Sequence, residues 1–226
     1  MPKERTDSTK PNRMMEVIAG IATIPQRVQE LINTINSLAP QVDMINVSLN
    51  GFDKPPFSHP KVNWYITDGT DEQKFKKIEG DVYLSCDDDI IYPPDYVDIV
   101  KAKLEKYDII SFHGRSFKQF PIQSYYKSAA SKYRCLDKVA VDISVHVGGT
   151  GVMAFYPEIF SLSLDELPYK YMADVQVAIA ARRRGLRITC IAHEAGWIKY
   201  QQVTNTIYDR FKNNDATQTR LINEYF

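Results

Sequence analysis

Apolar runs and amphipathic stretches alternate along the first part of the chain. Residues 17–22 are apolar throughout, which predicts a strand buried on both faces. Pro25 ends this strand, and between residues 26 and 38 apolar side chains recur at helical spacing. Three further strands are predicted at residues 44–49, 62–66 and 82–86.

The same alternation continues through the second part of the chain. After Pro93 and Pro94 a helix is expected at residues 95–106. Residues 114–147 interleave aromatic and cationic side chains, and we expect an irregular insert there, with a hairpin as one form, bordering a cleft. The remaining expectations are strands at 108–112, 152–156 and 187–192, a glycine-rich turn at 148–151, and a helix at 174–184 capped by Gly185.

These elements predict one α/β domain over residues 15–226, with a mostly parallel open sheet flanked by helices, after a flexible polar tail at residues 1–14. In open sheets of this kind, ligands bind beyond the carboxyl ends of the strands. Thr23, Asn50, Asp68 and Asp87 follow predicted strands and are therefore expected near a ligand.

The composition mainly excludes certain classes of protein and of binding partner. The 226 residues suit one large domain, and 28 Lys and Arg balance 28 Asp and Glu, so no long-range attraction to nucleic acid or anionic membrane is expected. No apolar run could span a bilayer, and residues 1–13 lack the apolar stretch of a signal peptide. Cys86, Cys135 and Cys190 are odd in number and far apart, as in buried thiols. We therefore expect a cytoplasmic protein, with peripheral association at the inner membrane face left open.

The strongest chemical signal is the triplet Asp87, Asp88 and Asp89 at the end of an apolar strand. Adjacent carboxylates repel one another unless a cation compensates. Mg²⁺ or Mn²⁺ would do so, and such ions are commonly shared between carboxylates and substrate phosphates, which indicates a nucleotide substrate. The alternative is a solvated acidic turn whose carboxylates cap the next helix.

Four motifs together resemble the GT-A glycosyltransferases, near glycosyltransferase family two and its bacterial surface-glycan members. They are the acidic strand end at residues 84–96 (LSCDDDIIYPPDY), the glycine turn at 148–151 (GGTG), the acidic helix start at 172–174 (MAD), and His193. Residues 22–27, 49–52 and 74–75 are also similar to family positions. The resemblance covers residues 17–199 and implies a GT-A type, Rossmann-like domain.

The resemblance also implies roles for individual residues. Asp174 would be the catalytic base, and Asp87, Asp89 and His193 would hold Mn²⁺ or Mg²⁺. Ala173 stands where the family usually has Glu, so only the Asp of that motif carries over. The implied donor-binding residues are Thr23, Pro25, Arg27, Asn50, Lys74, Asp87, Asp88, Gly149 and Gly151.

Each role has a plainer alternative. Asp174 would serve only as a helix cap, or would bind acceptor hydroxyls in a retaining enzyme. Asp88 and Lys74 would be solvated surface charges, and His193 a partly buried histidine bonded to the backbone. The other histidines, His59, His113 and His146, are expected to be structural.

The leading hypothesis is a metal-dependent, inverting glycosyltransferase that moves a sugar from a nucleotide-sugar donor to a glycan or glycolipid acceptor, such as lipopolysaccharide or capsule. A modified DNA base is an alternative acceptor, which the neutral charge disfavours and the cationic stretch at 115–134 favours. A nucleotide-sugar or glycan-binding module without turnover is a second alternative. A nucleotidyltransferase is disfavoured, because residues 23–27 lack a glycine-rich phosphate loop.

Overall fold

The computed structural model describes residues 14–204 and 206–226. The polar tail predicted for residues 1–14 therefore lies, apart from Met14, outside the described residues. No helix in the described part of the chain has both the length and the apolar character needed to cross a membrane.

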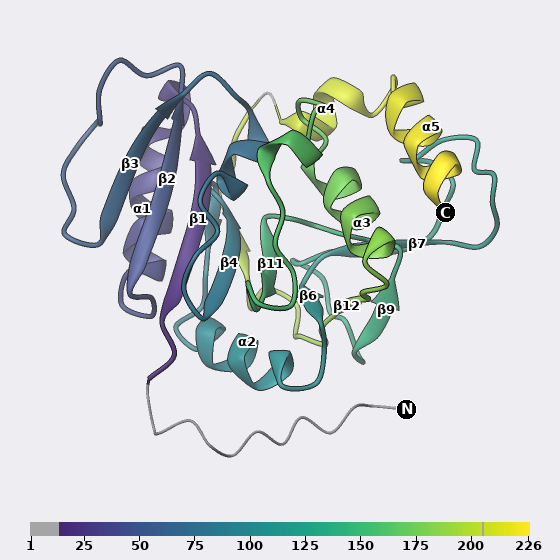
Figure 1. The fold of residues 1–226 in the computed structure, drawn as a ribbon, viewed down its shortest axis with the longest axis horizontal. Helices are drawn as coiled ribbons and strands as arrows, with labels where there is room; N and C mark the ends of the chain where they lie inside the picture. The colour runs from purple at the N-terminus through teal and green to yellow at the C-terminus, as the bar shows by residue number, and fades with distance from the viewer. Residues whose placement is uncertain (1–13, 205) are drawn as a thin grey trace.

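An eight-stranded sheet forms the centre of the molecule (Figure 1). β9 and β11 run antiparallel to their neighbours, and the other adjacent strands are parallel, which confirms the predicted mostly parallel open sheet of an α/β protein. In spatial order the strands are β3 (Val62–Thr67), β2 (Met44–Asn50), β1 (Val17–Thr23), β4 (Val82–Asp87), β11 (Val152–Phe155), β6 (Ile109–Ser111), β12 (Ile188–Cys190) and β9 (Ile143–Val145).

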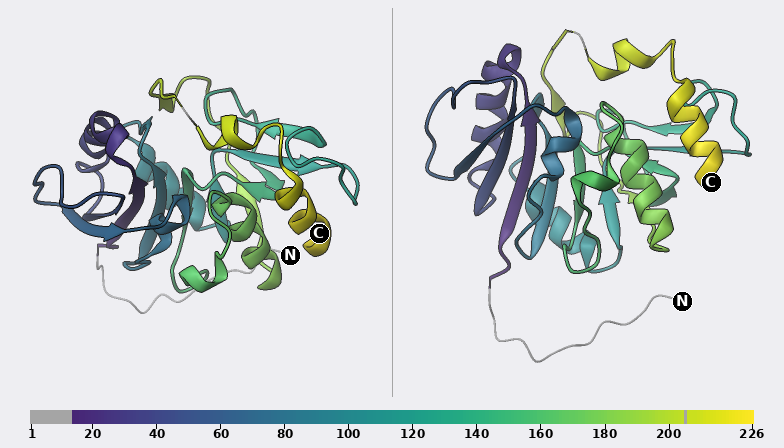
Figure 2. Two further views of the ribbon diagram at one scale, coloured as in Figure 1. Left: turned by 90° about the horizontal axis from the view of Figure 1, so that it is seen from above. Right: turned by 45° about the horizontal axis from the view of Figure 1, so that its top comes forward.

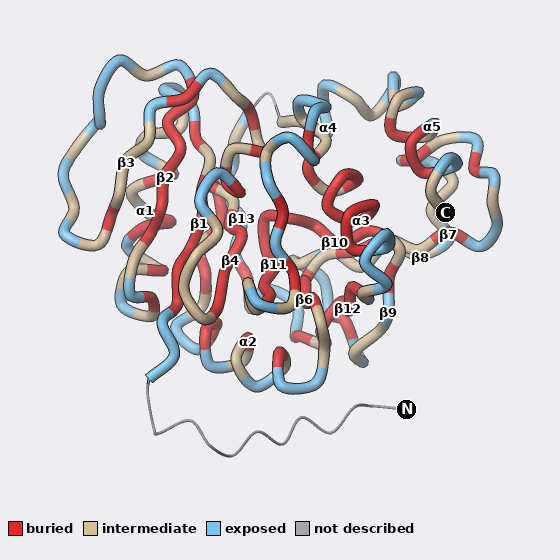
Figure 3. Tube along the Cα trace, in the orientation of Figure 1, coloured by how far each residue is buried: buried red, intermediate tan, exposed pale blue. Residues whose placement is uncertain are grey.

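Helices cover both faces of this sheet (Figure 2). α1 (Val28–Leu38) and α2 (Tyr96–Leu104) pack on one face, while α3 (Ala173–Arg183) and α5 (Ala216–Tyr225) pack on the other. Tyr83 and Leu84, which are consecutive in β4, belong to different apolar clusters, as alternate side chains of a strand must. β1 is buried along almost its whole length, as its apolar sequence predicts (Figure 3).

The insert is partly a hairpin. β7 (Gly114–Phe117) and β8 (Ala129–Tyr133) pair antiparallel, and β10 (Val147–Gly148) joins them in a small sheet. A second small sheet pairs β5 (Ile90–Ile91) with β13 (Lys199–Tyr200). Sequence patterns missed β5, β9, β13, the short α4 (Ile207–Phe211) and α5. The three strands have only two or three residues each and depend on pairing with distant segments, which local periodicity does not reveal.

Short 3₁₀ helices complete the described part of the fold: η1 (Pro25–Arg27), η2 (Asp71–Phe75) and η3 (Leu164–Glu166). The helix predicted at residues 26–38 is therefore η1 followed by α1. Gly185 follows α3 with φ of 70°, in the left-handed conformation expected of a helix-capping glycine.

The topology places the predicted site residues at one edge of the sheet. β1, β2, β4, β6 and β12 all run in the same direction, so Thr23, Asn50, Asp87 and His193 lie at or beyond their carboxyl ends. β11 is antiparallel and begins at this edge, which brings the glycine turn before it to the same place (Figure 1). This is the edge at which open α/β sheets bind ligands.

Gly20, in the middle of β1, allows η2 to lie against the sheet. A side-chain carbon at this position would overlap the Tyr83 hydroxyl and the backbone carbonyl of Lys74. The buried Tyr83 hydroxyl donates a hydrogen bond to that same carbonyl. A glycine in one strand and a tyrosine in the next therefore fix where η2, and with it Lys74, is held.

We predict that Gly20→Ala lowers the free energy of unfolding by about 1–3 kcal/mol, because buried backbone and a buried ring must move to admit the methyl group. Urea unfolding measures the change. Gly69→Ala is the matched control, since the added carbon there meets only the flexible side chain of Gln73. A Gly20→Ala protein as stable as the control would contradict this account of how η2 is seated.

Candidate functional site

Asp88 and Asp89 are buried behind Arg27, each with 4% of its surface exposed. Arg27 Nη1 donates to Asp88 Oδ1 at 2.9 Å and to Asp89 Oδ2 at 3.0 Å, and Thr23 Oγ1 donates to Asp88 Oδ2 at 2.7 Å. The alternative that Asp88 is a solvated surface charge is therefore wrong. So is the alternative that the triplet caps the next helix, because α2 begins after Asp95. Asp88 orients the turn after β4.

Asp89 offers an unused acceptor. Its Oδ1 is buried and has no hydrogen-bond partner among the described residues. The pKa of Asp89 is raised to about 7, mainly by burial and then by Asp87 and Asp88, while Arg27 and a hydrogen bond with Tyr200 oppose the rise. A buried carboxylate oxygen without a partner is costly, so this corner gains free energy from an additional cation.

His193 also presents a free lone pair. It is 9% exposed, and its Nδ1 lies 2.7 Å from the Ile191 carbonyl oxygen. Because a carbonyl can only accept, Nδ1 carries the proton in this contact and Nε2 of the neutral ring is an acceptor. Nε2 is buried and has no partner in the described part of the chain. A backbone-bonded Nδ1 with an unpartnered Nε2 is typical of metal-binding histidines. The geometry is therefore compatible both with a histidine bonded to the backbone and with a metal ligand.

The described residues contain no group of three or more His, Cys, Asp or Glu side chains arranged to hold a metal ion. Asp87, Asp89 and His193 therefore form no ready-made three-ligand set. β4 and β12 are three strand positions apart in the sheet, about 14 Å at ~4.8 Å per position. A metal site of fewer protein ligands, completed by substrate phosphates, stays a prediction.

Asp87 pairs with Lys74, which projects from η2. The Lys74 side chain is only 2% exposed, whereas that of Asp87 is 43% exposed. Burial lowers the pKa of Lys74, but Asp87 and Asp71 outweigh this and the net pKa is raised, so the amine stays charged. The alternative that Lys74 is a solvated surface charge is wrong. Lys74 and Arg27 are the cations through which the chain itself offsets the acidic triplet.

The glycine turn is shaped by its neighbours. A side-chain carbon on Gly151 would overlap the Asp87 carboxylate, and one on Gly149 would lie 2.8 Å from Cβ of His113. The Tyr92 hydroxyl accepts from the Asp87 amide at 3.0 Å and donates to the Gly151 carbonyl at 2.5 Å. Both glycines are therefore required by close approach, which a plain turn before a strand would not need.

Asp174 is held by the same turn. Its Oδ1 accepts from the Thr150 amide at 2.8 Å and from Thr150 Oγ1 at 2.7 Å. Met172, not Asp174, is the N-cap of α3, and no side chain caps it, so the helix-cap alternative is wrong. Both hydrogen bonds go to Oδ1, so Oδ2 of this firmly positioned carboxylate is the oxygen left to face a ligand.

Asn50, Thr23 and Pro25 lie where predicted, at the same edge. Asn50 is buried, donates to the Thr70 carbonyl at 3.1 Å and accepts from Thr67 Oγ1 at 2.5 Å, so it holds the loop that leads into η2. Pro25 begins η1. Contact of these residues with a donor remains a prediction.

Sequence reasoning missed Asp71. It lies in η2, and its Oδ2 accepts from the Ala173 amide at 3.2 Å. Burial raises its pKa to about 6; Lys74 opposes the rise, whereas Asp174 adds to it. A carboxylate thus lies beside Ala173, the position at which the acidic motif lacks its Glu. Asp71 lies shortly after β3. The rule that ligands bind beyond the carboxyl ends of the strands, called the strand-end rule below, could therefore have identified it from the sequence.

His113 was expected to be structural, yet it lies among the charged site residues. Burial lowers its pKa, Asp174 and Asp87 raise it, and Arg115 and Arg134 lower it. It follows the predicted strand at 108–112, so the same strand-end rule could have found it. His146 Nδ1 accepts from the Phe117 amide at 2.9 Å, in keeping with a structural role.

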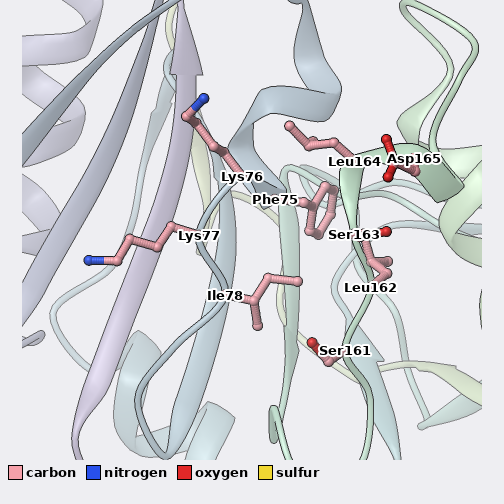
Figure 4. A pocket seen from close by; sticks show the side chains of 9 residues that line it. All are labelled: Phe75, Lys76, Lys77, Ile78, Ser161, Leu162, Ser163, Leu164 and Asp165. Atoms are coloured by element: carbon pink, nitrogen blue, oxygen red, sulfur yellow. The ribbon is translucent and has the colours of Figure 1, made fainter.

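A separate groove of about 560 Å³ lies away from these residues, between η2 and η3 (Figure 4). Phe75, Ile78 and Leu162 point into it, with Lys76, Lys77 and Asp165 at its rim. None of the predicted catalytic, donor or metal residues lines it.

Comparison with known proteins leaves the family of this chain undecided. No protein-family model matches the sequence, and no curated protein is significantly similar to it.

We predict that Asp71 makes stability depend on pH. Its pKa is 3.8 when free and about 6 when folded. Between these values the folded chain holds a proton that the unfolded chain has lost, so the free energy of unfolding falls as pH rises from about 4 to 6. An asparagine side chain cannot ionise, so Asp71→Asn gains about 1–3 kcal/mol relative to the wild type between pH 4 and 7.

Urea unfolding at pH 4, 5.5 and 7 tests this. The control is Asp98→Asn, on the exposed side of α2. If Asp71→Asn follows the wild-type pH profile in parallel, the carboxyl does not carry the proposed proton.

Proposed function

We propose that the protein is a metal-dependent glycosyltransferase of GT-A type that moves a sugar from a nucleoside diphosphate donor to an acceptor hydroxyl with inversion. The observation that supports it best is a chain of contacts among three of the four motifs behind the family resemblance. Asp174 is held by Thr150, and the neighbouring Gly151 lies against Asp87. Motifs spread over almost ninety positions thus meet at the ligand-binding edge of the sheet.

Asp174 is the general base in this proposal. Thr150 fixes Oδ1, and Oδ2 accepts the proton of the acceptor hydroxyl as its oxygen attacks the anomeric carbon. The bond from that carbon to the donor phosphate breaks, and the nucleoside diphosphate leaves with the electron pair. A single displacement of this kind inverts the configuration.

The leaving diphosphate gathers negative charge. Asp89 Oδ1 and His193 Nε2 are buried acceptors without partners among the described residues, which fits a divalent cation, and Asp87 is the exposed carboxylate close to Asp89 in sequence. Mn²⁺ or Mg²⁺ held by one or two of these residues and completed by the donor phosphates would supply Lewis-acid stabilisation of the leaving group. Lys74 pairs with Asp87, and Arg27 pairs with Asp88 and Asp89, so the three carboxylates are held in place for such an ion.

The acceptor in this proposal is a surface glycan or glycolipid such as lipopolysaccharide or capsule, as the family resemblance implies. A binding module without turnover is the competing function, favoured by the absence of Glu at position 173. Asp71, which approaches the same backbone position, restores a carboxylate there and supports the enzyme instead.

A thermal-shift panel of nucleotide sugars, with and without Mn²⁺, tests donor binding. We expect one donor to raise the Tm in the presence of Mn²⁺, because ligands that bind the native state stabilise it. Asp89→Asn should lose the Mn²⁺-dependent part of the shift, whereas the exposed Asp98→Asn should keep it. A panel without any stabilising donor, or an Asp89→Asn protein with an unchanged shift, contradicts the proposed site.

Asp174→Asn separates binding from turnover. We expect the donor-dependent shift to persist and kcat to fall by about 10²–10⁴-fold, the usual contribution of a general base. Initial rates with the donor identified above provide the measurement, and Asp98→Asn is again the control. Unchanged kcat in Asp174→Asn would remove this residue from the mechanism.

A further inference from the structure

The insert concentrates positive charge. Residues 114–135 contain no Asp or Glu and five cations, although the whole chain is neutral. The cations are Arg115, Lys118, Lys127, Lys132 and Arg134. A local excess of this kind in a neutral protein favours an anionic ligand at this surface.

Arg115 lies against two aromatic rings. Its guanidinium lies 4.2 Å from the centre of the Tyr125 ring and 5.1 Å from that of Tyr126. No carboxylate of the described residues pairs with Arg115 or with Arg134. The two rings therefore contact the face of the Arg115 guanidinium. The N–H groups along its edge, which bind carboxylate or phosphate, have no acidic partner among the described residues.

Both arginines lie close to the turn that holds Asp174. Arg115 pairs in β7 with Val147 of β10, three residues before Thr150, and Thr150 donates to Asp174. Arg134 follows Tyr133, which pairs with Gly114, the residue after His113. Burial lowers the pKa of His113 most and Asp174 raises it, while Arg115 and Arg134 accordingly both lower it.

The hydroxyl of Tyr125, whose ring contacts Arg115, is a buried polar group without a hydrogen-bond partner among the described residues. The residue is 2% exposed. A buried hydroxyl without a partner costs about 1–3 kcal/mol. The Tyr125 ring lies directly under Arg115, so a ligand that reaches the arginine is close to this hydroxyl.

Aromatic side chains continue outward from the base. Tyr126 meets Tyr208 of α4 edge to face at 5.3 Å, and Arg210 stacks on Tyr171 at 4.4 Å. Tyr171, three residues before Asp174, has φ of 63°, a strained conformation for a residue with a side chain. Its amide is held by Thr70 Oγ1 at 3.0 Å. Strain retained next to a base is expected where a ring must be presented to a ligand.

We propose that Arg115, Arg134, Tyr125 and Tyr126 form an acceptor subsite that takes a sugar carrying a phosphate or carboxylate group. The inference rests on the proposed function and names the substrate class of that site. The half-buried Tyr126 ring fits the apolar face of a pyranose, and the arginine edges fit the anionic group. Two arginines at neighbouring positions of β7 and the end of β8 favour one anionic group over a nucleic-acid strand, which would need a track of phosphate contacts.

Binding of small acceptor analogues tests the subsite without donor or metal. Ligand-observed NMR titrations compare methyl glucuronide and methyl glucoside 6-phosphate with uncharged methyl glucoside. We expect the charged probes to bind about ten- to a hundredfold more tightly, the range for hydrogen bonds to charged groups. The two charged probes show whether carboxylate or phosphate is preferred.

Three variants assign the effect. Arg115→Gln should abolish the preference for charge, and Arg115→Lys, which keeps the charge and guards against misfolding, should reduce it through loss of the planar fork. Arg183→Gln is the control. Arg183 stacks on Tyr225 at 4.4 Å, but lies nine residues along α3 from Asp174, about 13 Å away. It should leave the preference unchanged.

Equal binding of charged and uncharged probes, no binding of any probe, or a preference that survives Arg115→Gln would overturn the subsite. Salt-sensitive binding of a thymidine decamer that exceeds the affinity for both charged sugars would assign the face to nucleic acid instead and overturn it as well. A failure of donor binding in the thermal-shift panel, by contrast, contradicts the proposed function. It does not affect the interpretation of these titrations, which contain neither donor nor metal.

Discussion

The site depends on two cations, the buried Lys74 and the partly buried Arg27, that pair with three adjacent carboxylates. Lys74 pairs with Asp87, and Arg27 bridges Asp88 and Asp89. Without them the triplet would repel itself at the end of a buried strand, and breaking a buried ion pair typically costs about 3–5 kcal/mol. Lys74 reaches Asp87 only because Gly20 and Tyr83 seat η2 against the sheet. Gly20, in the middle of β1, thus determines where Lys74 lies at the ligand-binding edge of the sheet.

The turn before β11 connects the two halves of the site. On one side Gly151 lies against Asp87, and on the other Thr150 holds Asp174 with two hydrogen bonds. The Tyr92 hydroxyl ties the turn to the end of β4. A carboxylate facing a donor and a carboxylate facing an acceptor would therefore share one rigid support, as a displacement reaction that needs both reactants in line requires.

Polar side chains with distant partners explain most of the differences between expectation and structure. Lys74 is isolated in sequence, which is typical of a surface residue, but Asp87, Asp71 and Asp174 surround it in space. Asp174 occurs at a helix start, which favours a cap, but Thr150, on a different element, binds it. Asp71 and His113 carried no motif, although both follow strands and the strand-end rule applies to them equally.

The sequence by itself determined the α/β architecture, the order of the main strands and helices, and the edge at which polar residues gather, because burial on a sheet or helix leaves a regular pattern of apolar positions. Only the tertiary structure decided which charges pair, which carboxylates lose water and where Arg115 and Tyr125 lie relative to Asp174. Those outcomes depend on contacts between segments that are distant in the chain, and local periodicity contains no information about such contacts.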